Sequence, residues 1–122
     1  MQNTTEGKSA LGLDGNVTAL IGYIIPLVAL ILVFMEKDNK FVRFHSIQSL
    51  LYSVAITIVM IALVIFSVML AFISGTLATL FSLIWLLIWL GVLAGALFLA
   101  YKAYQGQMFK LPVIGDMADK WT

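Results

Sequence analysis

The chain has 122 residues, of which 62% are hydrophobic and only 11% carry a charge, and its mean hydropathy is +1.07. Soluble domains have about 25% charged residues, and a soluble domain this small could not bury so much apolar surface. The composition therefore predicts a membrane protein. The net charge of +1 excludes a broad electrostatic surface for nucleic acid, and the absence of cysteine excludes disulfides and thiolate chemistry.

Residues 1–16 (MQNTTEGKSALGLDGN) are polar. They do not form a secretory signal, because the apolar run begins late and no small-residue cleavage site follows it. We expect a polar, extracytoplasmic N-terminal tail.

Residues 17–35 form the first uncharged apolar run, which ends at Glu36. About 20 apolar residues are needed to cross about 30 Å of hydrocarbon, so this run predicts one transmembrane helix. Pro26 has no N–H, and the carbonyl of Gly22 loses its helical partner. We expect a kink, with a neighbouring helix or water bonding that carbonyl. A hinge is one interpretation of Pro26, and an ordinary membrane-helix proline is the favoured one.

Residues 44–101 contain no Asp, Glu, Lys or Arg. This run is too long for one span and too short for three, which would need about 60 residues before any loops. Ser74-Gly75-Thr76 is the best turn signal near its middle. The sequence therefore predicts helices over 44–73 and 77–101, and an all-α, polytopic membrane fold of three transmembrane helices (17–35, 44–73 and 77–101) joined by short loops.

The basic residues predict the orientation. Three lie in the loop between the first two predicted helices, three lie in the tail 102–122, and only Lys8 precedes the first helix. Basic residues favour the cytoplasmic side of short loops. With three spans in the cell membrane, this places the N-terminus outside and the C-terminal tail in the cytoplasm.

Polar residues gather where the second predicted helix begins. His45, Gln48, Ser49 and Tyr52 recur at i, i+3, i+4 and i+7, so they share one helical face. Unpaired polar groups in lipid cost several kcal/mol, and this face should meet other helices or a water-filled vestibule. We call it the polar lip.

His45 allows two interpretations. It could be a metal or haem ligand or a pH switch, because its unperturbed pKa is about 6.5. A metal site needs several ligands, however, and the chain has one His and no Cys. We favour a hydrogen-bonded His45 that ties the second helix to the tail, and we predict no metal site and no cofactor.

The tail contains the segment Leu-Pro-Val-Ile-Gly-Asp at residues 111–116. Pro112 and Gly115 both oppose a regular helix, so we expect a short extended or turn segment. Asp116 lies on the same side of the membrane as Arg43, whose planar guanidinium matches a carboxylate. We therefore predict an ion pair between Arg43 and Asp116.

Gly91 and Gly95 form a G-x-x-x-G motif in the third predicted helix. This spacing lets membrane helices approach closely. One interpretation is a homo-oligomer formed through Gly91 and Gly95. The favoured one is packing against another helix of the same chain.

The stretches LDGNVTALIGYIIP, FVRFHSIQSLL and KLPVIGDMA together resemble the Tic-twenty-like family of small prokaryotic membrane proteins. That domain-of-unknown-function family is related to the chloroplast inner-envelope protein-import component. The resemblance covers about residues 10–118. It implies a helical membrane protein with no known catalytic activity and no established biochemical role.

The motifs of common enzymes are missing from the sequence. We find no nucleophile–base pair, paired carboxylates, HExxH motif or Gly-rich phosphate loop. We therefore expect a non-enzymatic protein of structural or assembly type that packs through the polar lip. Its expected partners are the lipid bilayer, other copies or a membrane-protein complex, and no nucleic acid. The alternative is a protein translocation or insertion component, related by resemblance to the import family, in which the polar face lines a passage.

Overall fold

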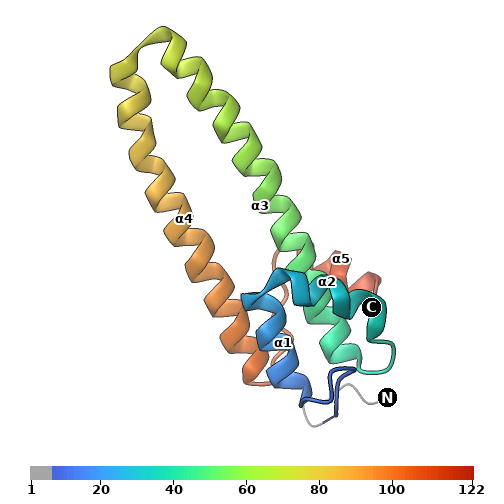
Figure 1. Ribbon diagram of the computed structural model, residues 1–122. Coiled ribbons are helices and arrows are strands. Elements are labelled where there is room, and N and C mark those ends of the chain that lie inside the picture. The colour runs from blue at the N-terminus through green and yellow to red at the C-terminus, as the bar shows by residue number, and fades with distance from the viewer. Residues whose placement is uncertain (1–6) are drawn as a thin grey trace.

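The computed structural model describes residues 7–122, and residues 1–6, the start of the predicted extracytoplasmic tail, lie outside the described residues. The regular secondary structure of the described residues is helical apart from one isolated bridge between Lys8 and Asp14. Its helices are α1 (Gly15–Ile24), α2 (Pro26–Met35), α3 (Lys40–Ile73), α4 (Gly75–Tyr104) and α5 (Ile114–Lys120). Figure 1 shows α3 and α4 as a long hairpin, with α1, α2 and α5 gathered around its open end.

We divide the molecule into a base and an arm. The base comprises α1, α2, the first turns of α3 (residues 40–49), the last turns of α4 (residues 99–104) and the C-terminal tail. The arm comprises the rest of α3 and α4, residues 50–73 and 75–98. The buried residues of α4 are Leu99, Ala100 and Ala103, all in the base.

The prediction of a single helix over residues 17–35 is wrong. The chain forms two ten-residue helices, α1 and α2, and reverses direction between them at Ile25. Pro26 is the first residue of α2, and the proline ring forces Ile25 out of the helical region to φ −122° and ψ 93°. A Cβ on Gly22 would lie 3.7 Å from the Cβ of Ala29, so the two helices pack closely where they meet.

The segment that precedes α1 meets the segment that follows α2. The backbone N–H of Ala10 donates to Oε1 of Glu36 at 2.6 Å, and Nδ2 of Asn39 donates to the carbonyl of Gly7 at 3.2 Å. A straight helix over 17–35 would hold its ends about 28 Å apart. Among the described helices, only α3 and α4 are long and apolar enough to cross a bilayer, so the prediction of three transmembrane helices is not confirmed.

The two long helices agree with the sequence prediction to within a few residues. The predicted ranges 44–73 and 77–101 correspond to α3 and α4, and both helices extend further into the base. Ser74 separates them in an extended conformation, and its side chain accepts a hydrogen bond from the N–H of Leu77. The all-helical class is confirmed.

Burial differs sharply along α3. All but one of residues 41–49 are buried, because α1, α2 and the tail surround this part of the helix. The arm is exposed along its length, and near its tip Phe72 is 88% exposed and Ile73 is 74% exposed. An apolar surface this extensive is suited to lipid.

The tail is more regular than the sequence predicted. The extended or turn segment expected over 111–116 ends early, because α5 begins at Ile114. The N–H of Ile114 bonds the carbonyl of Pro112 across Val113, whose φ is +66° and ψ −54°. This is a γ-turn of the rarer kind, and it turns the chain sharply into α5.

Candidate functional site

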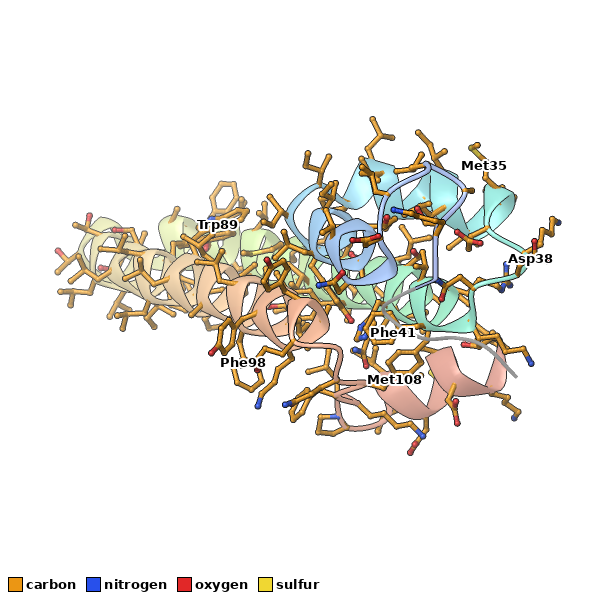
Figure 2. The ribbon with its side chains drawn as sticks, turned by 90° about the horizontal axis from the view of Figure 1, so that it is seen from below. Met35, Asp38, Phe41, Trp89, Phe98 and Met108 are labelled. Atoms are coloured by element: carbon orange, nitrogen blue, oxygen red, sulfur yellow. The ribbon has the colours of Figure 1, made fainter. Side chains whose placement is uncertain are left out.

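Three of the four residues of the polar lip, His45, Gln48 and Ser49, lie in the interior of the base. The imidazole of His45 is 1% exposed and is enclosed by three aromatic rings in edge-on geometry. Their centroids lie 4.6 Å (Phe41), 5.1 Å (Phe44) and 5.3 Å (Tyr23) from that of His45. Figure 2 shows Phe41 and Met108 facing one another between α3 and the tail, whereas Trp89 and Phe98 point outward from α4.

Both ring nitrogens of His45 are hydrogen-bonded. Nε2 lies 3.0 Å from the carbonyl oxygen of Gln107, and Nδ1 lies 2.7 Å from the hydroxyl of Tyr23. A carbonyl can only accept, so Nε2 carries the hydrogen and Nδ1 accepts from Tyr23. The neutral imidazole thus joins α1 to the tail, and neither nitrogen is left for a metal ion.

Gln48 adds three further hydrogen bonds between α3, α1 and the tail. Its amide nitrogen donates to the Tyr23 hydroxyl at 2.8 Å and to the carbonyl of Phe109 at 2.9 Å. Its Oε1 accepts from the N–H of Leu111 at 3.0 Å. Both amide hydrogens and the amide oxygen are therefore used, and the bonds point to a helix on one side and to the tail on the other. We call Tyr23, His45 and Gln48 the polar cluster.

Ser49 bonds the carbonyl that Pro26 leaves without a partner. Its Oγ donates to the carbonyl of Gly22 at 2.8 Å. The missing N–H of Pro26 would have bonded that carbonyl in a continuous helix. The expectation that a neighbouring helix bonds this carbonyl is confirmed, although the chain reverses there instead of kinking.

Tyr52 joins α3 to α4 where the base meets the arm. Its hydroxyl donates to the carbonyl of Val92 at 2.9 Å. A Cβ on Gly95 would collide with that hydroxyl and lie 3.4 Å from the Tyr52 ring carbon Cζ. Gly91, by contrast, has no neighbour within 4 Å of such a Cβ. Gly95 therefore serves packing within the chain, and Gly91 lies open on the surface of α4.

Gly115 lets the tail approach α3. A Cβ at this position would lie 2.6 Å from Cα of Lys110 and 2.9 Å from Oε1 of Gln48. Pro112 lies in the turn that leads into α5 and is exposed. A side chain at Gly115 would therefore push the tail away from the amide that holds it.

The predicted ion pair between Arg43 and Asp116 is not formed. One guanidinium nitrogen of Arg43 donates to the carbonyls of Val33 (3.1 Å) and Glu36 (2.7 Å), at the end of α2. The other lies 3.4 Å from the carbonyl of Trp121. The last carbonyls of a helix lack internal donors, so α2 offers acceptors that a search for carboxylates does not find. Asp116 is exposed.

Two residues of the base were missed by the sequence analysis. Tyr23 is 3% exposed and central to the polar cluster, and its signal was a phenol in an apolar helix, which usually has a partner when buried. Glu36 is also 3% exposed, and its carboxylate accepts from the backbone N–H groups of Ala10 and Asn39. Its position at the end of the apolar run resembled that of an ordinary exposed loop residue.

The chemistry available to the site is limited. Among residues 7–122, no group of three or more His, Cys, Asp or Glu side chains lies close enough to bind a metal ion. Of the buried side-chain polar atoms in the same range, only Oγ of Ser46 lacks a hydrogen-bond partner. The polar cluster therefore holds segments of the chain together, with its hydrogen-bonding capacity used internally.

Comparison with known proteins places the chain in a family. Residues 9–118 match the model of the Magnetosome magnetite crystal formation protein family. The chain belongs to this family. It is 37% identical to a UPF0132 membrane protein of Methanocaldococcus jannaschii over 119 residues, which cover 95% of this chain and 96% of that protein. It is 31% identical to a UPF0132 membrane protein of Archaeoglobus fulgidus over 106 residues, covering 86% and 92%. No solved structure matches the chain.

This membership corrects the resemblance drawn from the sequence. The assignment to the Tic-twenty-like family is wrong, because the family that matches is a different one. The three stretches that suggested it all lie within the matched range 9–118. Short motifs beside apolar helices can occur in more than one family of membrane proteins. The chain is a small membrane protein, and neither the family description nor the relatives' names state an enzymatic activity.

Proposed function

We propose that this chain is a non-enzymatic membrane protein of structural or assembly type, in which a folded base carries a two-helix transmembrane arm. The observation that supports this is the closure of the polar cluster. His45, Gln48 and Tyr23 bond to one another and to the tail, so they fix the base and offer no free group for catalysis. The exposed apolar arm is the surface left for lipid and for membrane partners.

We propose further that both described ends of the chain lie on the cytoplasmic side. The meeting of residues 7–10 with residues 36–39 supports a re-entrant α1–α2 hairpin, which would enter the membrane layer without crossing it. Only α3 and α4 then cross. All seven Lys and Arg residues of the chain fall at the base end, and the turn at Ser74 has none near it. The positive-inside rule favours a cytoplasmic base.

The arm has the length this arrangement needs. Residues 50–73 make about 36 Å of helix at about 1.5 Å per residue, and about 30 Å suffices to cross the hydrocarbon. The buried first turns of α3 stay with the base at the membrane surface. With the base at the membrane surface, the polar cluster would be surrounded mainly by protein and not by lipid.

We propose that the chain has a structural role in a homo-oligomer or in a larger membrane complex. The family description names magnetite crystal formation. Residues 7–122 bring together no group of three metal-ligating side chains, and the role we propose involves no mineral binding. For an oligomer, open Gly91 is the better contact, since Gly95 already packs against Tyr52.

Thiol accessibility tests the closed cluster. The chain has no cysteine, so Ser49→Cys and Asp38→Cys are each single reporters in the full-length protein. Ser49 is 2% exposed and Asp38 is exposed, so a small water-soluble maleimide should label Asp38→Cys rapidly and Ser49→Cys only after denaturation. Rapid labelling of Ser49→Cys in the folded protein would show a water-filled passage and contradict the proposal.

Tag protection tests the orientation. Epitope tags at the N-terminus and at the C-terminus should both resist protease in intact cells and both be cut in inverted vesicles. A digested N-terminal tag with a protected C-terminal tag in intact cells would restore three spans and reject the re-entrant hairpin.

A further inference from the structure

A groove runs along one side of the arm between α3 and α4. Two spaces of about 310 Å³ and 420 Å³ share Ile56, Thr57 and Trp89, so they form one continuous groove. The first begins at the tip of the α1–α2 hairpin, where Pro26 lines it, and the second ends beside Trp85. The two helices therefore leave a gap beside the membrane-crossing part of the chain.

The groove is polar at one end only. Near the base its lining includes the hydroxyl residues Ser49, Tyr52, Ser53 and Thr57. Beyond Thr57 the lining is aliphatic apart from the two indole rings, and the Nε1 of Trp85 already donates to Oγ of Ser67 at 3.2 Å. None of the described lining residues carries a charge. An occupant must therefore have an apolar body and an uncharged, hydrogen-bonding head at the base end.

The hydroxyls of the polar end accept more readily than they donate. Tyr52 and Thr57 already donate to the carbonyls of Val92 and Ser53, so their free lone pairs favour a head group that has a donor. Ser53 contributes a half-buried hydroxyl at the mouth of the groove. A head that both donates and accepts, such as an alcohol, matches this lining.

The occupant must be thin, because it has to lie between two neighbouring helices, α3 and α4, that contact one another. The gap is also closed toward the arm tip, where Phe66 and Phe81 meet with ring centroids 5.1 Å apart. A single hydrocarbon chain is thin enough to enter, and filling the gap restores the dispersion contacts that an empty one lacks.

We propose that this groove binds one chain of a neutral membrane lipid whose hydroxyl head lies among Tyr52, Ser53 and Thr57. The inference goes beyond the structural role proposed above. It rests on the arm lying in lipid, but it does not depend on the direction in which the chain crosses the membrane.

Tryptophan fluorescence offers a direct test. In the full chain carrying Trp121→Phe, the remaining indoles are Trp85 and Trp89, and both line the groove. The probe is dioleoylglycerol brominated on its acyl chains, titrated into the purified protein in detergent micelles. We expect saturable quenching, which unbrominated dioleoylglycerol reverses. Ser53→Ala, which removes one hydroxyl, should weaken the apparent affinity about fivefold.

Two Ala→Leu variants distinguish binding in the groove from contact of lipid with the outer surface of the arm. Ala96 lines the polar end, so Ala96→Leu should abolish the saturable quenching by filling the space. Ala62 is exposed on α3 and is not part of the groove, so Ala62→Leu should leave the affinity within about twofold. Circular dichroism and size-exclusion chromatography verify that each variant is folded.

Two results would overturn the proposal. Quenching that rises in proportion to the brominated lipid and is equal in Ala96→Leu and Ala62→Leu would show contact with bulk lipid only. A change in oligomeric mass in Ala96→Leu, without a change in lipid affinity, would assign the groove to a second copy. Neither result bears on the tag-protection test of orientation, so the two proposals can fail separately.

Discussion

In the base, the polar side chains of α3 bond to other segments of the chain, whereas most hydroxyl groups of the arm bond to their own helix. His45 reaches the carbonyl of Gln107, 62 positions away, and Gln48 reaches that of Phe109, 61 positions away. In the arm, Thr57, Ser67 and Thr79 each donate to the carbonyl four residues earlier. The polar groups of the base therefore specify tertiary structure, and those of the arm leave its outer surface free for any apolar neighbour.

Glycines in the base and in the arm also differ in how closely the rest of the chain packs against them. Gly115 in the base is pressed against the Lys110 backbone and the Gln48 amide, but Gly91 in the arm touches nothing. Substitutions in the base should therefore be costly even without lipid or partners. Beyond the contact between Tyr52 and α4, substitutions in the arm should have their main effects where lipid or another protein covers it.

The largest expected effect comes from Gln48→Leu. The change removes three hydrogen bonds and leaves the buried Tyr23 hydroxyl, Phe109 carbonyl and Leu111 N–H short of partners. We expect a loss of about 3 kcal/mol in the free energy of unfolding. Unfolding in mixed micelles of increasing SDS fraction measures it. Thr79→Val in the arm is the control and should change stability by less than about 0.5 kcal/mol. Equal losses in both variants would remove the distinction between base and arm.

Gly115→Ala should come next. The added methyl group meets the backbone of Lys110, and overpacking of this kind costs about 2 kcal/mol. Limited proteolysis should cut the tail of this variant faster than that of the parent protein. Gly91→Ala is the matched control, and in a monomer it should be neutral or slightly stabilising because alanine favours helix. If Gly91→Ala instead lowered the oligomeric mass, the open glycine would be placed in an interface between copies.

Arg43→Lys should cost about 1.5 kcal/mol. Lysine cannot reproduce the planar fork that bonds two carbonyls of α2 and approaches that of Trp121. Asp116→Asn should be neutral within error in the same SDS titration. Because the two side chains do not pair in the structure, Arg43→Asp combined with Asp116→Arg should not recover stability. Recovery in that double variant would revive the ion pair.

Tyr52→Phe should have the smallest effect, about 1 kcal/mol. It removes the single hydrogen bond from the Tyr52 hydroxyl to the carbonyl of Val92 and keeps the ring against Gly95. Tyr101→Phe is the control, since Tyr101 is exposed and its hydroxyl accepts from Gln105 one turn along. Thermal unfolding followed by circular dichroism would compare the two. A larger loss in Tyr101→Phe would show that the junction of arm and base is not where α3 and α4 are fixed.

The sequence predicted the arm well because its helices follow from local properties. An uncharged run of the length of residues 44–101 with one turn signal leaves little choice but two membrane helices. The same arithmetic failed for residues 17–35, which are also long enough to cross. The lost donor at Pro26 was visible in the sequence. Its replacement by Ser49, 27 positions from Gly22, depends on tertiary packing that periodicity does not reveal.

The hydrogen-bond partners of the polar side chains in the base were harder to predict, because they also depend on tertiary packing. Helical spacing was enough to place His45, Gln48 and Ser49 on one face of α3. Their acceptors, however, include the backbone carbonyls of Gln107, Phe109 and Gly22, and carbonyls have no signature in a sequence. Arg43 was likewise matched to the carboxylate of Asp116, although its acceptors are carbonyls as well. The polar side chains indicated that the base is held together by hydrogen bonds. The fold was needed to show which groups accept them.

The meeting of Ala10 with Glu36 also bears on how the protein is made. In the proposed orientation both ends of the first apolar segment lie on one side, so neither Lys8 nor Asp14 has to be carried through the hydrocarbon during synthesis. In that orientation the piece of chain that passes to the far side is the short turn at Ser74, which has no charged group to dehydrate. Insertion can therefore be driven by the apolar content of α3 and α4 alone, as a pair of helices that enters the bilayer loop first.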